Sequence, residues 1–90
     1  MQTRREQIRK AVTNKGWQTF RLSLKGKPTA EKLALLEEYY HWGLINGHPR
    51  EMVDIRIDNY IKALCRGGQL YPGESLQTAL DSNWELRIKR

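Results

Sequence analysis

Apolar residues recur at helical spacing in two long stretches of the chain. In residues 29–43, Leu33, Leu36 and Tyr40 fall on one line of a helix. In residues 50–66, one helical face carries the apolar residues Val53, Ile57, Tyr60, Ile61 and Leu64. Both stretches therefore predict amphipathic helices.

Helix-breaking residues bound these two stretches. Pro28 precedes the first, and Gly67 and Gly68 follow the second. Residues 43–49 between them contain two glycines and a proline, which predicts a turn. We therefore expect a helical hairpin whose core contains Leu36, Tyr40, Ile57, Ile61 and Leu64.

The segments that flank the hairpin carry weaker signals. Residues 2–13 have the pattern of a short basic helix, which residues 14–16 (Asn-Lys-Gly) should interrupt. Residues 17–25 fit both helical and strand spacing, and helix is favoured because a glycine and a proline follow shortly after. Residues 74–80 fit one or two helical turns, with Ser75 as the cap.

The C-terminal part has the pattern of short strands. Leu70 and Tyr71 have the composition of a strand start, and apolar residues alternate with charged ones over residues 84–88. Together these segments predict a short β-hairpin. The alternative for residues 84–89 is a final helix.

Residues 57–70 (IDNYIKALCRGGQL) resemble the recognition helix and exit of winged helix-turn-helix DNA-binding domains. That family often shows similarly spaced apolar residues in this helix, followed by glycine and an apolar strand start. In this resemblance, which covers residues 50–90, the predicted β-hairpin would be the wing. The resemblance implies DNA binding through the helix of residues 50–66.

The expected fold class is mainly α. We predict a small helical domain built on the hairpin of residues 29–43 and 50–66, with α+β, winged-helix-like character if the β-hairpin forms. Ninety residues suit a single domain over residues 1–90. It divides into a basic N-terminal segment, residues 1–27, and a helical core with an irregular C-terminal part, residues 28–90.

Positive charge is concentrated at the N-terminal end. Residues 1–27 hold eight basic residues and one acidic residue, whereas residues 28–90 hold eight basic and nine acidic ones. The formal net charge of +6 therefore originates in the N-terminal segment. Such a concentration predicts a polyanionic partner, either nucleic acid or an acidic protein surface. A solubilising tail is the alternative.

Two sets of residues are candidates for contact with nucleic acid. In the N-terminal segment, the basic side chains that would follow phosphates are Arg4, Arg5, Arg9, Lys10 and Lys15. Trp17 and Phe20 would either stack on unpaired bases or fill the core. On the helix of residues 50–66, a polar face could read bases, and it consists of Arg56, Asn59, Lys62 and Arg66. The alternative is an ordinary solvated helix face.

Few residues offer catalytic or metal-binding chemistry. Five of the carboxylates on the two long helices are candidates for a Mg²⁺ site, and ion pairing is the simpler interpretation of them. These five are Glu37, Glu38, Glu51, Asp54 and Asp58. His41, His48 and Cys65 show none of the spacings of zinc motifs. We therefore expect no enzyme, no metal and no cofactor.

Residues 39–42 are four bulky residues in a row, which cannot all enter one small core. Tyr39, Tyr40 and Trp42 are therefore candidates for a partner interface or the contact of a homodimer. No apolar run approaches the roughly 20 residues of a membrane span, and the N-terminus lacks the apolar part of a secretory signal. The lone Cys65 fits a reducing compartment, so we expect a cytoplasmic protein without a membrane partner.

These observations support two functions. The first is a small, basic, non-catalytic nucleic-acid-binding protein, above all a DNA-binding regulator or accessory factor. The alternative is a small adaptor or inhibitor, of the phage or mobile-element type, that binds an acidic protein surface.

Overall fold

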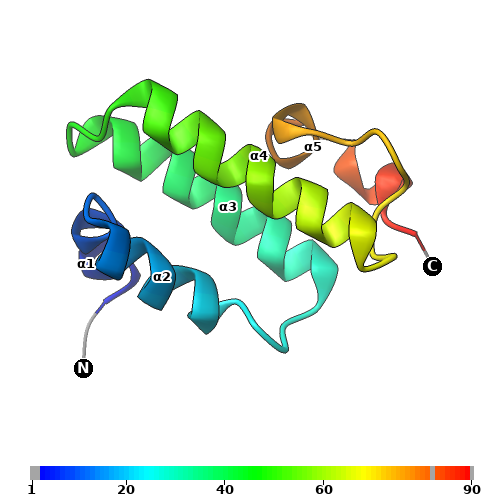
Figure 1. The fold of residues 1–90 in the computed structure, drawn as a ribbon, viewed down its shortest axis with the longest axis horizontal. Helices are drawn as coiled ribbons and strands as arrows, with labels where there is room; N and C mark the ends of the chain where they lie inside the picture. Colours follow the sequence, from blue (N-terminus) through cyan, green and yellow to red (C-terminus); the bar gives the residue numbers. More distant parts are fainter. Residues whose placement is uncertain (1–2, 82, 90) are drawn as a thin grey trace.

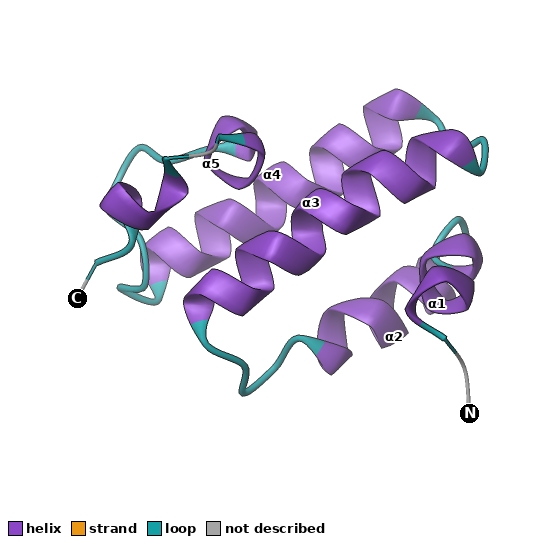
Figure 2. Ribbon diagram, turned by 180° about the vertical axis from the view of Figure 1, so that it is seen from behind, coloured by secondary structure: helices purple, strands orange, loops and turns teal. Residues whose placement is uncertain are grey.

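The computed structural model describes residues 3–81 and 83–89. In chain order its helices are α1 (Arg4–Lys10), α2 (Asn14–Ser23), α3 (Thr29–Ile45), α4 (Arg50–Arg66) and α5 (Leu76–Leu80), followed by a 3-10 turn at Trp84–Arg87. Figures 1 and 2 show α3 and α4 running antiparallel through the centre, with α1 and α2 on one side and the C-terminal elements on the other. The fold is mainly helical, as the apolar spacing predicts.

The hairpin of α3 and α4 confirms the central prediction. Pro28 and Pro49 immediately precede the two helices, and their φ angles of −57° and −58° suit a helix start. In the connecting loop, Gly47 has a φ of 84°, a conformation that glycine adopts without steric strain. Helix α3 extends past residue 43 and ends at Ile45.

The core follows the predicted faces with one exchange. Tyr40, which was expected in the core, is half-buried, whereas Tyr39 is fully buried. The reason is that α1 and α2 cover a second face of α3, where the Tyr39 ring packs on Phe20 of α2 with ring centroids 5.5 Å apart. The other expected core residues are buried, namely Leu36, Ile57, Ile61 and Leu64.

A tight turn joins α1 to α2. The amide of Gly16 donates a hydrogen bond to the Thr13 hydroxyl at 3.0 Å, which caps α2. A Cβ at Gly16 would lie 1.9 Å from the carbonyl oxygen of Lys10, so a side chain there would force the two helices apart. The predicted interruption at residues 14–16 is therefore wrong, because those residues form the first turn of α2 and the break lies at residues 11–13.

The predicted C-terminal β-hairpin is also wrong for the residues that the structure describes. Leu70 and Ile88 form one isolated antiparallel bridge, and no strand is present in the described part of the chain. Residues Trp84–Arg87 instead form the 3-10 turn. The amide of Leu86 donates to the carbonyl oxygen of Asn83 at 3.1 Å within this turn, and the guanidinium of Arg87 pairs with Asp81 at 2.7 Å.

Helix α5 is anchored to α4 rather than capped by Ser75. The Ser75 side chain makes no capping hydrogen bond, and the amide of Leu76 donates to the Asp58 carboxylate at 3.1 Å. Lys62 also lies 2.9 Å from this carboxylate. The hydrogen bond from Lys62 is the main cause that lowers the pKa of Asp58.

Leu36 provides a test of the core. We expect Leu36→Ala to lower the free energy of unfolding by about 2–5 kcal/mol, because it removes a fully buried side chain and leaves a cavity. The matched control is Leu86→Ala, which should change that free energy by less than about 0.5 kcal/mol because Leu86 is 80% exposed. Urea denaturation followed by circular dichroism measures both, and equal effects would contradict the assigned core.

His48 attaches α1 to the loop of the hairpin. Its side chain is buried, and Nε2 lies 3.3 Å from the carbonyl oxygen of Arg9. Because a carbonyl oxygen only accepts, Nε2 carries the proton in this contact. Burial lowers the pKa of His48, the contact with Arg9 opposes that shift, and the charge of Arg56 adds to it. The folded protein therefore favours the neutral imidazole.

We expect the free energy of unfolding to fall as the pH drops below about 6.5, because the unfolded chain then binds a proton at His48 more readily than the folded one. His48→Gln should remove this dependence, since its amide nitrogen can still donate to Arg9 and does not titrate. Denaturation curves at pH values between about 4.5 and 7 measure the effect, above the range in which Asp58 titrates. If the free energy of unfolding of His48→Gln still falls in this pH window, another group causes the effect.

Candidate nucleic-acid interface

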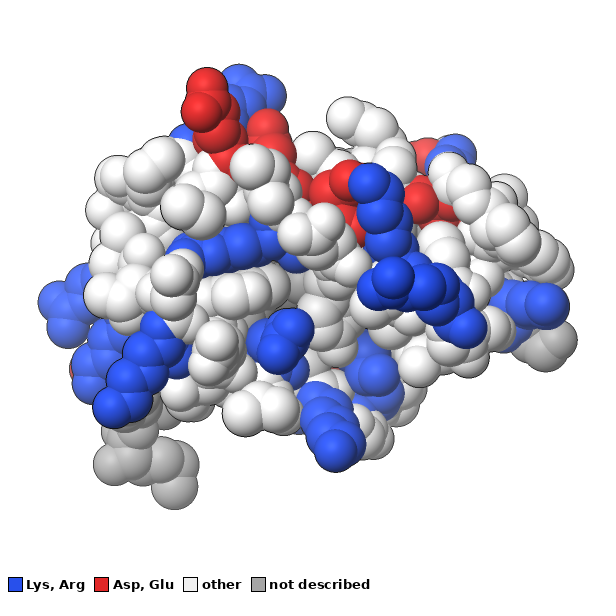
Figure 3. Space-filling view, viewed as in Figure 1, with Lys and Arg blue, Asp and Glu red and all other residues white. Residues whose placement is uncertain are grey.

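A groove runs between α2 and α4, on the face of the molecule that Figure 3 shows. Its volume is about 520 Å³. One wall comes from α2 and Lys25, which lies just beyond its end, and the other comes from α4 and Gln69 beyond it. Helix α3 contributes Lys32 from its first turn. The lining consists of Trp17, Arg21, Leu22, Lys25, Lys32, Arg56, Asn59, Tyr60, Ala63, Leu64, Arg66 and Gln69.

The charge of this groove has one sign. Five of its lining residues are basic and none of them is acidic, the basic ones being Arg21, Lys25, Lys32, Arg56 and Arg66. Figure 3 shows Lys and Arg side chains across the middle and lower parts of this face, whereas Asp and Glu lie toward the top of the molecule in this view. A recess lined by positive charge concentrates the field and attracts polyanions.

Lys32 lies deep in this groove. Its side chain is 9% exposed, and its ammonium lies 3.4 Å from the amide oxygen of Gln69. That oxygen also accepts a hydrogen bond from the Thr29 hydroxyl at 3.1 Å. An ammonium has three donors, so this single long contact leaves most of its hydrogen-bonding capacity for water or a ligand.

Arg56 is the second buried cation of the groove. Only 6% of it is exposed, and its Nη1 donates to the Tyr39 hydroxyl at 3.1 Å and to the carbonyl oxygen of Ala11. Its Nη2 donates to the Asn14 side chain at 3.1 Å. The Ala11 carbonyl belongs to the end of α1, where the helix dipole is negative, so the guanidinium is favourably placed there.

Two half-buried aromatic rings contribute to the lining, Trp17 from α2 and Tyr60 from α4. The Trp17 ring packs against Tyr39 with ring centroids 5.0 Å apart. Burial raises the pKa of Tyr60, and the charge of Arg21 opposes that shift. The groove also contains a cation beside an aromatic ring, because the guanidinium carbon of Arg56 lies 5.6 Å from the ring centroid of Trp17.

The structure brings together three of the four residues predicted on the helix of residues 50–66. Asn59 and Arg66 are exposed and line the groove. Arg56 also lines it, but its predicted place on an exposed face is corrected, because its guanidinium is held by three oxygens in the interior. Lys62 is not among the residues that line this groove, and it pairs with Asp58 at 2.9 Å.

The predicted basic residues of the N-terminal segment are not among those that line this groove. Arg4 pairs with Glu38 of α3 at 2.6 Å, with more than half of its side chain exposed. The guanidinium carbon of Arg5 lies 3.8 Å from the ring centroid of Trp42, a cation–π contact. Arg9 is exposed on α1.

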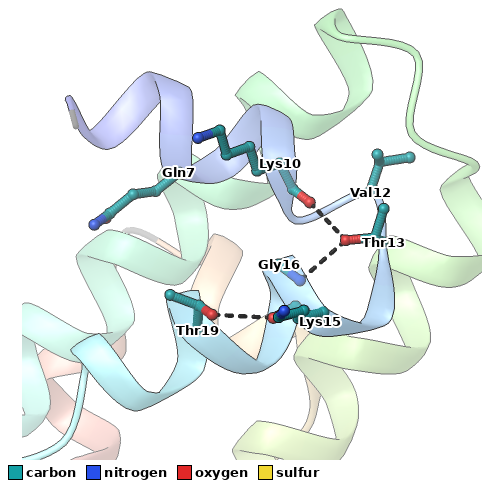
Figure 4. A pocket seen from close by; sticks show the side chains of 7 residues that line it. All are labelled: Gln7, Lys10, Val12, Thr13, Lys15, Gly16 and Thr19. Atoms are coloured by element: carbon teal, nitrogen blue, oxygen red, sulfur yellow. Dashed lines mark hydrogen bonds between the residues drawn. The ribbon is translucent and has the colours of Figure 1, made fainter.

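Lys10 and Lys15 line a separate hollow of about 350 Å³ between α1 and α2. Figure 4 shows the hydrogen bonds beside this hollow, in which the Thr13 hydroxyl donates to the Lys10 carbonyl and accepts from the Gly16 amide. The two lysines therefore contribute charge next to a rigid turn. The hollow is smaller and carries fewer cations than the groove.

The aromatic cluster of residues 39–42 divides between core and surface. Tyr39 is fully buried, so its prediction as an interface residue is corrected. Tyr40 and Trp42 are half-buried against the core and keep part of their rings exposed. Their role in an interface stays a prediction. Phe20 is 1% exposed and fills the core.

Sequence reasoning missed three cations of the groove, Arg21, Lys25 and Lys32. For the first two a signal exists, because they are four residues apart and therefore share a helix face in the basic N-terminal segment. For Lys32 we find no such signal. It stands between an acidic residue and an apolar one in a helix whose other polar residues are mostly solvated.

No family model, curated protein or solved structure matches this chain. Among the residues that the structure describes, no three His, Cys, Asp or Glu side chains lie close enough together to hold a metal ion. No described helix combines the length and the apolar character that crossing a bilayer requires.

Arg56 provides a test of the groove's architecture. We expect Arg56→Lys to lower the free energy of unfolding by about 1–3 kcal/mol, because one ammonium cannot reach the three oxygens that the planar guanidinium joins. Tyr39→Phe removes only one of these oxygens and should lower it by about 0.5–1.5 kcal/mol. Urea denaturation compares the variants. An Arg56→Lys variant as stable as the wild type would show that this network contributes little.

Proposed function

We propose that this chain is a small, non-catalytic nucleic-acid-binding protein, a DNA-binding regulator or accessory factor, that holds its ligand in the groove between α2 and α4. The observation that carries the proposal is the lining of this groove, which contains five basic residues and no acidic one. The N-terminal basic residues supply a further attraction of longer range.

Each part of the groove matches a part of a nucleic acid. Arg21, Lys25 and Arg66 are exposed and offer charged donors to phosphate oxygens. Asn59 has both donors and an acceptor, which base edges require. Trp17 and Tyr60 offer aromatic surface beside these cations.

An acidic protein surface would be attracted by the same cations, and it is the alternative partner. Carboxylates satisfy the charge of the groove, but they bring no planar rings for Trp17 and Tyr60 to stack on. The aromatic residues within the basic lining therefore favour nucleic acid over protein.

The salt dependence of binding tests the proposal. Each phosphate contact adds about 0.7–0.9 to the slope of log affinity against log salt concentration. We expect the double variant Arg21→Gln, Arg66→Gln to lower that slope by roughly twice this amount. The matched control is Arg50→Gln, which removes an arginine from α4 at a position that does not line the groove.

Fluorescence anisotropy with labelled oligonucleotides, over about 50–200 mM salt, measures these slopes. A labelled poly-glutamate peptide represents the acidic protein surface. The wild type could bind the peptide as tightly as the oligonucleotide, and the double variant could lose both. That outcome would indicate a protein as the partner in place of nucleic acid. A slope that the double variant leaves unchanged would remove the groove from the proposal.

A further inference from the structure

The groove changes in character from its rim to its floor. Arg21 and Arg66 are exposed at the rim, whereas Lys32 and Arg56 are 9% and 6% exposed at the floor. Tyr60 is half-buried between these levels. A ligand that touches the rim alone would use only part of the positive charge and none of the deeper aromatic surface.

Building on the proposed function, we propose that the groove accommodates an unpaired, single strand of nucleic acid. In this arrangement the sugar–phosphate backbone follows the cations of the rim, one phosphate reaches Lys32, and a base lies against Tyr60. A groove of about 520 Å³ is open enough for such a segment of one strand.

The shape of the groove separates a single strand from a duplex. Proteins read duplex DNA with an element that protrudes into a major groove about 12 Å wide. Here Asn59 and Arg66 belong to a recess, with α2 as its other wall. A duplex carries its phosphates on a stiff convex surface and keeps its bases stacked inside, so it would meet the rim and leave the floor empty.

The charge of the floor points to the same ligand. Among the described residues, Lys32 has one acceptor, the Gln69 amide oxygen at 3.4 Å, and no carboxylate pairs with it. An ammonium on a largely buried lysine without a counter-ion is less stable than one in water, and an entering anion relieves that cost. The phosphate of a flexible strand can enter the recess to reach it.

Tyr60 supplies the second contact that only an unpaired strand can use. Bases whose faces are free stack on aromatic side chains, largely independently of sequence. In a duplex those faces are already covered by neighbouring bases. Arg21 lines the same groove and adds positive charge to the recess that the stacked base would enter.

Two substitutions at Tyr60 form a matched pair. Tyr60→Leu keeps an apolar side chain but removes the ring, and Tyr60→Phe keeps the ring but removes the hydroxyl. The probes are labelled DNA strands of about ten nucleotides, a site size typical of single-strand binding, tested alone and as a duplex with the complement. An RNA strand of the same sequence identifies the preferred sugar.

We expect the wild type to bind the single strand more tightly than the duplex. Tyr60→Leu should weaken single-strand binding by about tenfold or more and duplex binding by less than about twofold. Tyr60→Phe should change neither by more than about twofold. A preference for either the DNA or the RNA strand is compatible with the proposal.

Circular dichroism and thermal unfolding show first whether each variant is folded. If Tyr60→Leu is not folded, Lys32→Met makes the same comparison, since it removes the buried charge and keeps a long apolar chain. We expect it to weaken single-strand binding about tenfold, with Lys62→Met as the control outside the groove.

Two outcomes distinguish failure of this inference from failure of the proposed function. Tighter binding of the duplex, or equal losses for both probes in Tyr60→Leu, would overturn the single strand as the ligand and leave nucleic-acid binding intact. Binding of none of the oligonucleotides would overturn both.

Discussion

One buried cation without a carboxylate partner among the described residues connects the two halves of this protein. The guanidinium of Arg56 joins the end of α1, the first turn of α2 and Tyr39 of α3. A guanidinium in an apolar interior is unfavourable unless its donors are satisfied, and here neutral oxygens and a helix end satisfy them. Because Arg56 also lines the groove, the contact that positions α2 against the hairpin also defines the recess between them.

The helical hairpin could be predicted because its apolar residues repeat with the period of a helix over many turns. The choice between Tyr39 and Tyr40 could not, since it depends on which face of α3 the helices α1 and α2 cover. At the C-terminus, five alternating residues fit a strand. Four of them, Trp84–Arg87, form a 3-10 turn instead, and Arg87 pairs there with Asp81 and Glu74, contacts that the alternation does not encode.

The candidate site was predictable only in its parts. Asn59 and Arg66 could be placed on an exposed helix face by their spacing, and the charge of the N-terminal segment was visible in the sequence. The groove itself is a product of packing between segments some 40 residues apart. The burial of Arg56 and Lys32 could not be anticipated, because pattern reasoning assigns charged residues to the solvated side of a helix.

Stability and ligand binding place opposite demands on Lys32 if the groove holds an anion. A buried ammonium with a single long hydrogen bond disfavours the free protein, and a methionine or leucine would pack there with less desolvation. Selection for thermal stability alone would therefore replace this lysine, whereas selection for an anionic ligand would retain it. Related sequences that keep a basic residue at position 32, in the first turn of α3, would thus record a history of binding rather than of folding.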